Sequence, residues 1–505
     1  MHSHGKNILL IAVILPALAF AADLPPGGSP QDTGFAAYEG FIQQLMSENS
    51  IEGASFALFD DRNVIWSGGL GRMGGENDQP VTTQTIFSIQ SMSKTITATA
   101  VMIAVQEGLV DLDRPVTEYL PGFRVNSCFE NDPEKKITLR LMLGCAAGFT
   151  HEAPVGNNYD ASFPSYSEHF RSIRDTWLRS PVGTEYFYSN LGFDLAAEII
   201  EKVSGRTFAK YLEEKVFRPL GMVSATADPK KILESRMRAA GSASHYARIP
   251  VIVPMIGAGG VYASADDLVK FVQMHLSSGS PGGRRVLDKE YLAELYRPFI
   301  TGSYALGIAL VDDTAGYAFN HNGGGFGFGS TMKWYPEYNI GCVILSNRLY
   351  ESRVYETASR ILDEYIREQH LTKDTLTLFD PVAYWKHLTE AKKTTEHPAT
   401  APGRCPGDSV YKSEWGKYTG THLLGFSGGF EFAWYAKIAR WVGFKAPKVK
   451  VFEKDGGLFL DYHDGGSYLG EQRLVEYQPG LFFTAEGEAL DFRDGRKTYR
   501  NIALE

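Results

Sequence analysis

Ser91-Met92-Ser93-Lys94 places a hydroxyl and an amine three residues apart, at the start of a long apolar segment of this 505-residue chain. Residues with this spacing share one face of a helix. A serine hydroxyl is a poor nucleophile until a base removes its proton, and burial of a neighbouring lysine lowers the pKa of its amine toward that task. The spacing is therefore typical of serine enzymes that form an acyl-enzyme.

Three other serines, Ser3, Ser330 and Ser409, also stand three residues before a lysine, so the spacing alone is weak. Ser91 differs because a helix-length apolar run follows it and ends at Gly108, a natural helix stop. The run is apolar nearly all round, which predicts a buried helix. The N-terminus of such a helix offers free N–H groups to an anionic intermediate. Ser330, by contrast, begins a segment that reads as a strand.

The first residues are typical of a targeting segment. Lys6 supplies a positive charge, residues 8–18 are apolar, and Ala19-Phe20-Ala21 is a small-x-small cleavage site. The apolar core is short for a membrane span and is interrupted by Pro16. We expect residues 1–21 to be a signal peptide cleaved after Ala21, which predicts an exported protein, periplasmic or secreted, without an integral membrane segment after cleavage.

Charge and cysteine content narrow the function classes. The formal net charge of −9 argues against a nucleic-acid partner. Cys128, Cys145, Cys342 and Cys405 lie far apart and show no metal-ligand spacing, whereas disulfides are possible in an exported protein. Cys342 lies in an apolar run, so we expect a buried free thiol there. A Cys128–Cys145 pair is conceivable, and the sequence leaves both the pairing and the oligomeric state open.

The order of predicted elements indicates an α+β domain over residues 35–370. A strand hairpin is expected first, then helical and loop-rich sequence over residues 91–276, then further strands and a final helix. The hairpin covers residues 54–59 and 64–67, the later strands cover 306–311, 331–335 and 342–345, and the helix covers 354–369.

Composition changes after His370. Residues 371–415 are expected to form a linker, with Thr, Ala, Pro and Gly concentrated over 394–408. Residues 416–505 contain short alternating runs broken by glycine, which predicts an antiparallel, β-barrel-like domain. The apolar stretch 430–444 is expected to be a helix or lid that packs within this domain.

Two further motifs follow Ser91 in the chain. Tyr188-Ser189-Asn190 joins a phenol, which can pass protons, to an amide, which can hold an amine and a substrate carbonyl. His321-Asn322-Gly323 is followed by Gly324, and glycines there would let a substrate backbone lie against a strand. Each motif is weak alone, because Tyr499-Arg500-Asn501 and His463-Asp464-Gly465 have the same patterns.

The order of the three motifs resembles the serine β-lactamase and penicillin-binding protein family, in the branch of class C β-lactamases, D-stereospecific peptidases and related esterases. That family carries S-x-x-K, Y-x-N and then K-T-G or H-x-G. Flanking segments are similar as well, at residues 108–115, 137–149, 217–222 and 259–271. The resemblance implies an antiparallel sheet flanked by helices with a helical insertion. Residues 416–505 resemble the lipocalin-like domain appended to some members.

The resemblance also implies roles for individual residues and no metal or organic cofactor. Ser91 would be the nucleophile, and Lys94 and Tyr188 would share general acid and base work. The backbone N–H groups of Ser91 and Gly324 would form the oxyanion hole. Substrate binding would fall to Asn190, His321, Gly323 and Gly324, with His321 on the edge strand of the sheet.

Departures from the family pattern bear on the substrate. His321 replaces a lysine, so less positive charge faces a β-lactam carboxylate. Less polar residues replace the family's pattern near the site, at Leu141, Gly144, Cys145, Ala146 and Ala147. We therefore expect a peptidase or amidase of D-amino-acid peptides, or an esterase, acting on a small-molecule or peptide substrate.

Three alternatives remain. The chain could be a β-lactamase, or a non-catalytic penicillin-binding or sensor protein on the same fold. It could also be an α/β-hydrolase esterase, because residues 425–429 match G-x-S-x-G with Ser427 at the centre.

Overall fold

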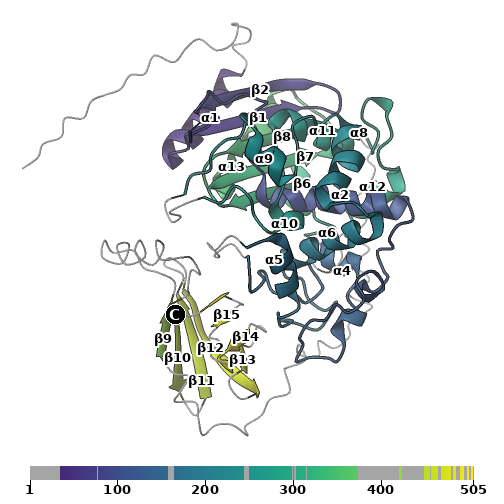
Figure 1. The fold of residues 1–505 in the computed structure, drawn as a ribbon. Coiled ribbons are helices and arrows are strands. Elements are labelled where there is room, and N and C mark those ends of the chain that lie inside the picture. Colours follow the sequence, from purple (N-terminus) through teal and green to yellow (C-terminus); the bar gives the residue numbers. More distant parts are fainter. Residues whose placement is uncertain are drawn as a thin grey trace, which may run out of the picture.

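The computed structural model describes residues 35–373, apart from positions 77, 157–163, 244–248, 298–299, 301–302 and 314, and a set of strands between 420 and 503 (Figure 1). The expected signal peptide, nearly all of the expected linker, the stretch 430–444 and Ser427 lie outside the described residues.

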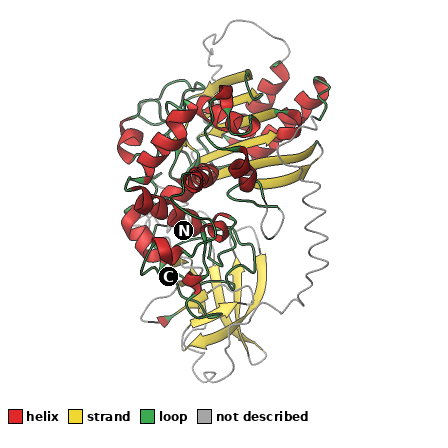
Figure 2. Ribbon diagram, turned by 90° about the vertical axis from the view of Figure 1, so that its right-hand side faces the viewer, coloured by secondary structure: helices red, strands yellow, loops and turns green. Residues whose placement is uncertain are grey.

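A six-stranded antiparallel sheet in the order β2-β1-β8-β7-β6-β5 forms the centre of the first part of the chain (Figure 1). Residues from the two ends of this part pair directly, since Ala54 lies opposite Ser346. Every residue of β1, β7 and β8 is buried, because helices cover both faces of the sheet (Figure 2). The strands are β1 (Gly53–Phe59), β2 (Val64–Gly71), β5 (Ala309–Asp313), β6 (Gly316–Gly325), β7 (Phe328–Tyr335) and β8 (Ile340–Ser346).

The predicted hairpin and the two last strands of this sheet are confirmed. The strand expected at 306–311 begins three residues later, at Ala309, and the sequence did not predict β6 as a full strand. Its glycine-rich second half lacks the apolar alternation by which strands are recognised. The antiparallel sheet rules out the α/β-hydrolase alternative, whose strands would be largely parallel.

Alternate residues of the strands contribute to two cores. Phe56, Leu58 and Ile344 face α1 (Ala36–Asn49) and α13 (Glu351–Glu368). The neighbouring strand residues face the larger helical side, which contains α2 (Ser93–Gln106), α6 (Leu191–Ser204) and α11 (Ala265–Leu276). A two-stranded sheet of β3 (Phe87–Ser88) and β4 (Tyr262–Ala263) lies on that side. The other helices are α3 (Val116–Tyr119), α4 (Leu139–Leu143), α5 (Tyr166–Ile173), α7 (Phe208–Leu212), α8 (Arg218–Leu220), α9 (Pro229–Glu234), α10 (Ile256–Gly259) and α12 (Lys289–Leu295).

The helix predicted after Ser91 is present and buried along its length. Every side chain from Ser93 to Ala104 is buried, and Gly108 follows the helix end with a φ of 71°. Ser91 itself lies in the 3₁₀ turn η1 (Gln90–Met92) that precedes α2. Gln90 adopts a φ of 49°, so the chain turns sharply between β3 and the helix and presents Ser91 at the turn.

The C-terminal strands form an eight-stranded antiparallel sheet in which neighbours in sequence pair with each other. Its core contains Val449, Val451, Leu460 and Phe482. The described strands are β9 (Gly420–Leu423), β10 (Lys448–Lys454), β11 (Gly457–His463), β12 (Tyr468–Gln478), β13 (Leu481–Thr484), β14 (Ala489–Asp491), β15 (Thr498–Tyr499) and β16 (Ile502–Ala503). The predicted antiparallel β region is confirmed, while its lipocalin-like character stays a prediction.

The cysteines differ in oxidation state, as free thiols or in a disulfide. Cys145 and Cys342 are free and buried, which confirms the thiol expected at Cys342. Cys128 is disulfide-bonded, so the conceivable Cys128–Cys145 pair is wrong. Cys128 packs against Leu481 and Ala489 of the C-terminal sheet. Within the described part of the chain, every helix is too short or too polar to cross a membrane.

Candidate active site

Ser91 and Lys94 meet as the spacing predicted. Lys94 Nζ donates a hydrogen bond to Ser91 Oγ over 3.1 Å. The 3₁₀ turn and the first turn of α2 supply this geometry, since both residues lie on one side of a continuous helical segment. Ser91 is partly exposed and Lys94 is fully buried. Ser91 is thus partly open to solvent while the Lys94 amine is shielded from it.

The Lys94 amine has two further acceptors. Asn190 Oδ1 lies 2.7 Å away and the carbonyl oxygen of Ala258 lies 3.1 Å away. Asn190 precedes α6, and its own amide Nδ2 donates to Glu152 Oε1 over 3.2 Å. With Ser91 Oγ, these acceptors match the three N–H bonds of an ammonium group, which allows the cation to be buried.

Burial lowers the pKa of Lys94 to about 8, against the opposing effect of the Asp194 and Glu152 carboxylates. An amine with this pKa is neutral in roughly one molecule in ten at pH 7. It can therefore accept a proton from Ser91 near neutral pH, which an unperturbed lysine rarely does.

Tyr188 lies beside the same amine. Lys94 Nζ is 4.8 Å from the centre of the Tyr188 ring. Burial raises the pKa of Tyr188 well above its ordinary value of 10.0, and a hydrogen bond with Ser91 acts in the opposite direction. The phenol is therefore protonated at neutral pH and suits the passage of a proton rather than its permanent removal.

The glycines of β6 allow the strand to approach the turn that holds Ser91. A Cβ on Gly323 would lie 2.0 Å from the carbonyl oxygen of Ile89, two residues before Ser91. Ser330 Oγ donates to the same carbonyl over 3.0 Å. The edge-strand expectation needs correction, because β5 is the outermost strand. Since β5 pairs only with the 316–320 part of β6, residues 321–325 still have no partner on that side among the described strands.

His321 is held by two neighbours. Its Nδ1 lies 2.7 Å from the Asn322 carbonyl oxygen and its Nε2 lies 3.0 Å from the Tyr304 hydroxyl. A carbonyl only accepts, so Nδ1–H donates to Asn322 and Nε2 accepts from Tyr304. Burial, and then the charge of Lys94, lower the pKa of His321 to about 3. The ring is therefore neutral at pH 7, with both nitrogens engaged.

Tyr304 is part of an aromatic wall that the sequence did not reveal. Its ring centre lies 5.5 Å from that of Tyr186 and 6.0 Å from that of Tyr188. His151 also lies against Tyr188, with 5.6 Å between ring centres. Tyr304 belongs to no motif, so no pattern along the chain could have indicated it. The wall offers apolar surface next to Ser91.

A buried carboxylate holds the segment that contacts Lys94. Asp194 Oδ1 accepts hydrogen bonds from the backbone N–H groups of Gly257 and Ala258, over 2.9 and 3.0 Å. Asp194 Oδ2 lies 3.0 Å from His169 Nε2, and both side chains are fully buried. Asp194 thus orients the residue whose carbonyl accepts from Lys94. Asp194 stands four residues after Asn190 and therefore lies on the same helix face. This spacing is a feature of the sequence that could have indicated the role of Asp194.

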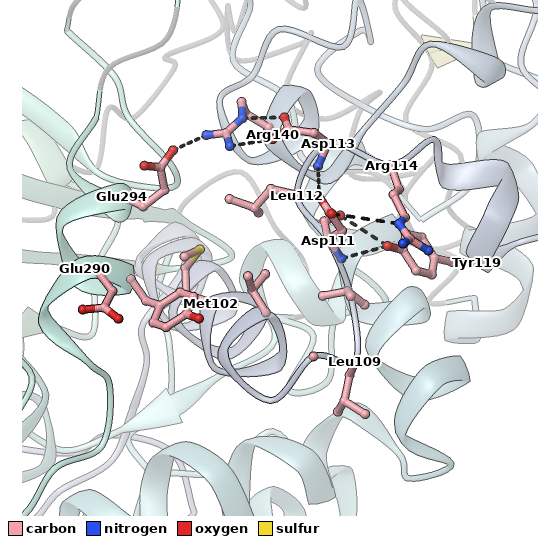
Figure 3. Close-up of a pocket in the computed structure, with 14 residues that line it drawn as sticks. Met102, Leu109, Asp111, Leu112, Asp113, Arg114, Tyr119, Arg140, Glu290 and Glu294 are labelled. Atoms are coloured by element: carbon pink, nitrogen blue, oxygen red, sulfur yellow. Dashed lines mark hydrogen bonds and ion pairs between the residues drawn. The ribbon is translucent and has the colours of Figure 1, made fainter.

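A pocket of about 620 Å³ lies near the other end of α2 (Figure 3). Arg140 in this pocket forms ion pairs with Asp113 and Glu294, so the main charged side chains of the pocket neutralise one another. The 14 residues of α2 span roughly 20 Å, which separates this pocket from Ser91. Within the described residues, no cluster of three or more His, Cys, Asp or Glu side chains is suited to a metal ion.

Comparisons with known proteins agree with this geometry. The family described as Beta-lactamase matches residues 39–365. Penicillin-binding protein 4 of Amycolatopsis lactamdurans is 27% identical over 326 residues, which cover 60% of this chain and 82% of that protein. The D-alanyl-D-alanine-carboxypeptidase/endopeptidase AmpH of Escherichia coli (strain K12) is 26% identical over 290 residues, which cover 54% of this chain and 74% of AmpH.

A solved structure shares the fold. The octameric penicillin-binding protein homologue from Pyrococcus abyssi has a TM-score of 0.57 and 21% sequence identity, and covers 92% of this chain and 95% of its own. The family match includes all three motifs and more than half of the residues. The chain therefore belongs to the beta-lactamase family and is a serine hydrolase.

Proposed function

We propose that this protein hydrolyses D-amino-acid peptides or amides, or short esters, through an acyl-enzyme on Ser91. The observation that carries the proposal is the 3.1 Å hydrogen bond between Ser91 Oγ and a buried Lys94 whose pKa is lowered to about 8. Neutral Lys94 takes the hydroxyl proton as Oγ bonds to the substrate carbonyl carbon. The backbone N–H groups of Ser91 and Gly324 stabilise the oxyanion that forms.

Collapse of this intermediate breaks the bond to the leaving group. The leaving group receives a proton from Lys94, with Tyr188 as the carrier between them. A water molecule then attacks the acyl carbon and gives a proton to Lys94. The bond between Ser91 Oγ and the acyl carbon breaks, Oγ takes that proton from Lys94, and the acid product leaves. Asn190 orients Lys94 and binds the substrate carbonyl, while His321 and Gly323 line the side on which the substrate lies.

The state of His321 supports a peptidase or esterase over an efficient β-lactamase. Penicillins and cephalosporins carry a carboxylate near the reacting carbonyl, and a neutral imidazole supplies no charge to bind it. Both ring nitrogens are already engaged by Asn322 and Tyr304. AmpH is named as a carboxypeptidase and endopeptidase, which agrees with a peptide substrate.

Residues 1–21 would be removed on export, residues 35–370 would form the hydrolase domain, and residues 371–415 would link it to a lipocalin-like domain at 416–505. N-terminal sequencing of the mature protein tests the cleavage, since a first residue of Ala22 is expected.

Labelling with a fluorophosphonate probe, followed by peptide mapping, tests the nucleophile. The adduct is expected on Ser91 and absent from Ser91→Ala, while Ser427→Ala labels like the unmodified protein. An adduct on Ser427 would overturn the assignment. A turnover panel of p-nitrophenyl acetate, p-nitrophenyl butyrate, D-alanyl amides, D-Ala-D-Ala peptides and nitrocefin then identifies the scissile bond. Nitrocefin turnover above that of the esters and amides would reject the peptidase or esterase assignment.

A further inference from the structure

The carboxylate of Glu351 lies directly against Gly324. Glu351 is the first residue of α13, and a Cβ on Gly324 would come within 2.5 Å of both Cδ and Oε2 of its side chain. A Cβ on Gly329, which pairs with Gly324 across β6 and β7, would lie 3.2 Å from the Glu351 backbone nitrogen. Any side chain at Gly324 would therefore displace the carboxylate. The glycine leaves room for an acidic group beside the proposed oxyanion donor.

The charge of Glu351 has no partner among the described residues, and its side chain is only partly buried. The neighbouring arginines bond elsewhere. Arg348 Nη1 donates to Ser242 Oγ over 3.4 Å, and Arg353 pairs with Glu356 over 2.8 Å. His321, on the same strand as Gly324, is neutral at pH 7. An unpaired, partly buried carboxylate projects a negative potential with little screening.

The first turn of a helix favours an acidic residue, because the helix dipole is positive there. This contribution would explain the presence of Glu351 through stability alone. It would not require the carboxylate to lie over the backbone of Gly324. The two roles also differ in consequence, since a purely stabilising carboxylate would not change how the enzyme discriminates between charged substrates.

We propose that Glu351 is a specificity determinant, which disfavours substrates with a carboxylate near the scissile carbonyl and favours those with an ammonium or uncharged group there. The proposal rests on the function proposed above and narrows its substrate class. A carboxylate close to Gly324 would meet a like charge, whereas an ammonium group would meet an opposite one. Three kinds of substrate fit this site: amides, substrates that carry an amino group, and peptides that continue well beyond the scissile bond. β-Lactams fit it less well, and so do peptides whose terminal carboxylate lies next to the scissile bond.

Reversible boronic acids test the proposal, because they bond to a reactive serine whatever its natural substrate. Three phenylboronic acids with a meta carboxylate, carboxamide or aminomethyl group differ mainly in charge. Their inhibition constants are measured against p-nitrophenyl acetate turnover. In the unmodified protein we expect the aminomethyl compound to bind tightest and the carboxylate weakest. Glu351→Gln should reduce the ratio between carboxylate and carboxamide by about tenfold, and Glu351→Lys should reverse it.

Matched variants separate charge at this position from net charge and from folding. Glu356→Gln removes the same charge further along α13 and should leave the ratio unchanged, while Glu351→Asp should largely keep it. Equal binding of carboxylate and carboxamide by the unmodified protein would overturn the proposal, and so would an unchanged ratio in Glu351→Gln. Failure of the function proposed above would look different, as absent ester turnover and no adduct on Ser91.

Discussion

Asn190 Oδ1 lies 2.7 Å from Lys94 Nζ, closer than the Ser91 hydroxyl at 3.1 Å. Asn190 therefore holds the amine at hydrogen-bond distance from the nucleophile, while the backbone of Ala258 holds it from another side. A lysine fixed in this way can exchange a proton with Ser91 without moving. The pKa of the amine then sets the pH at which the exchange is favourable.

The pH dependence of turnover should report that pKa. Burial lowers the pKa of Lys94 to about 8, so the neutral, basic form grows as pH rises through that value. We expect kcat/KM for p-nitrophenyl acetate to increase with pH and to level off above an apparent pKa of about 8. Rates measured between pH 5.5 and 9.5, corrected for spontaneous hydrolysis, test this. A plateau already complete below pH 7 would contradict Lys94 as the base.

Removing either proton-transfer group should greatly reduce turnover while the fold survives. Lys94→Ala and Tyr188→Phe are each expected to lower kcat by about 10²–10⁴-fold. The double variant should lose much less than the product of the two effects, because the groups act as one unit. Steady-state kinetics on the best ester or amide, with melting temperatures as the folding control, measure this. Near-full turnover by Tyr188→Phe on every substrate would exclude its catalytic role.

Neutralising Asp194 should change the pKa of Lys94. The Asp194 carboxylate raises that pKa, so Asp194→Asn should move the rise of the pH profile to lower pH, with about a tenfold loss of kcat from poorer positioning of Ala258. The pH–rate profile distinguishes this from general destabilisation. Asp267→Asn is the control, because Asp267 is also fully buried but hydrogen-bonds Ser224. An identical profile in both variants would show that Asp194 is only structural.

Replacing His321 by lysine should favour β-lactams. A lysine would be charged more often than this neutral imidazole and would attract a substrate carboxylate. We expect His321→Lys to raise nitrocefin turnover about tenfold relative to ester turnover. The ratio of kcat/KM values for nitrocefin and p-nitrophenyl acetate measures the change. A ratio that stays the same or falls would show that charge at this position does not limit β-lactam hydrolysis.

Two buried histidines should make the protein sensitive to acid. Burial lowers the pKa of both His275 and His321 to about 3, whereas unfolded histidine has a pKa near 6.5. As pH falls below 6.5, protons bind the unfolded chain first, so stability decreases until about pH 3. Each group contributes up to about 1.4 kcal/mol per pH unit. Urea unfolding from pH 7 to pH 4 measures the slope, which His275→Gln should reduce.

The sequence by itself predicted the features that depend on local spacing and alternation. Ser91 and Lys94 lie three residues apart at the start of a helix-length apolar run, so one helical turn joins them, whereas Ser330 and Lys333 have the same spacing and lie in strand β7. The same holds for the buried helix after Ser91 and for the hairpin of β1 and β2. The family resemblance carried by the order of the motifs also implied that Tyr188 and Asn190 would act with Lys94, and the structure places both beside its amine.

Contacts between distant segments were decided by the tertiary structure alone. The hydroxyl of Tyr304 donates to His321 Nε2, while burial and then the charge of Lys94 lower the pKa of His321 and keep the imidazole neutral. Asp194 supports Lys94 only because Ala258 folds between them. Glu351 lies on Gly324 because α13 begins over the end of β6. Spacing along the chain determines which residues share a face of a helix or strand. Burial and through-space contacts set the pKa values and the charge selectivity, and these arise only when the sheet and its helices pack together.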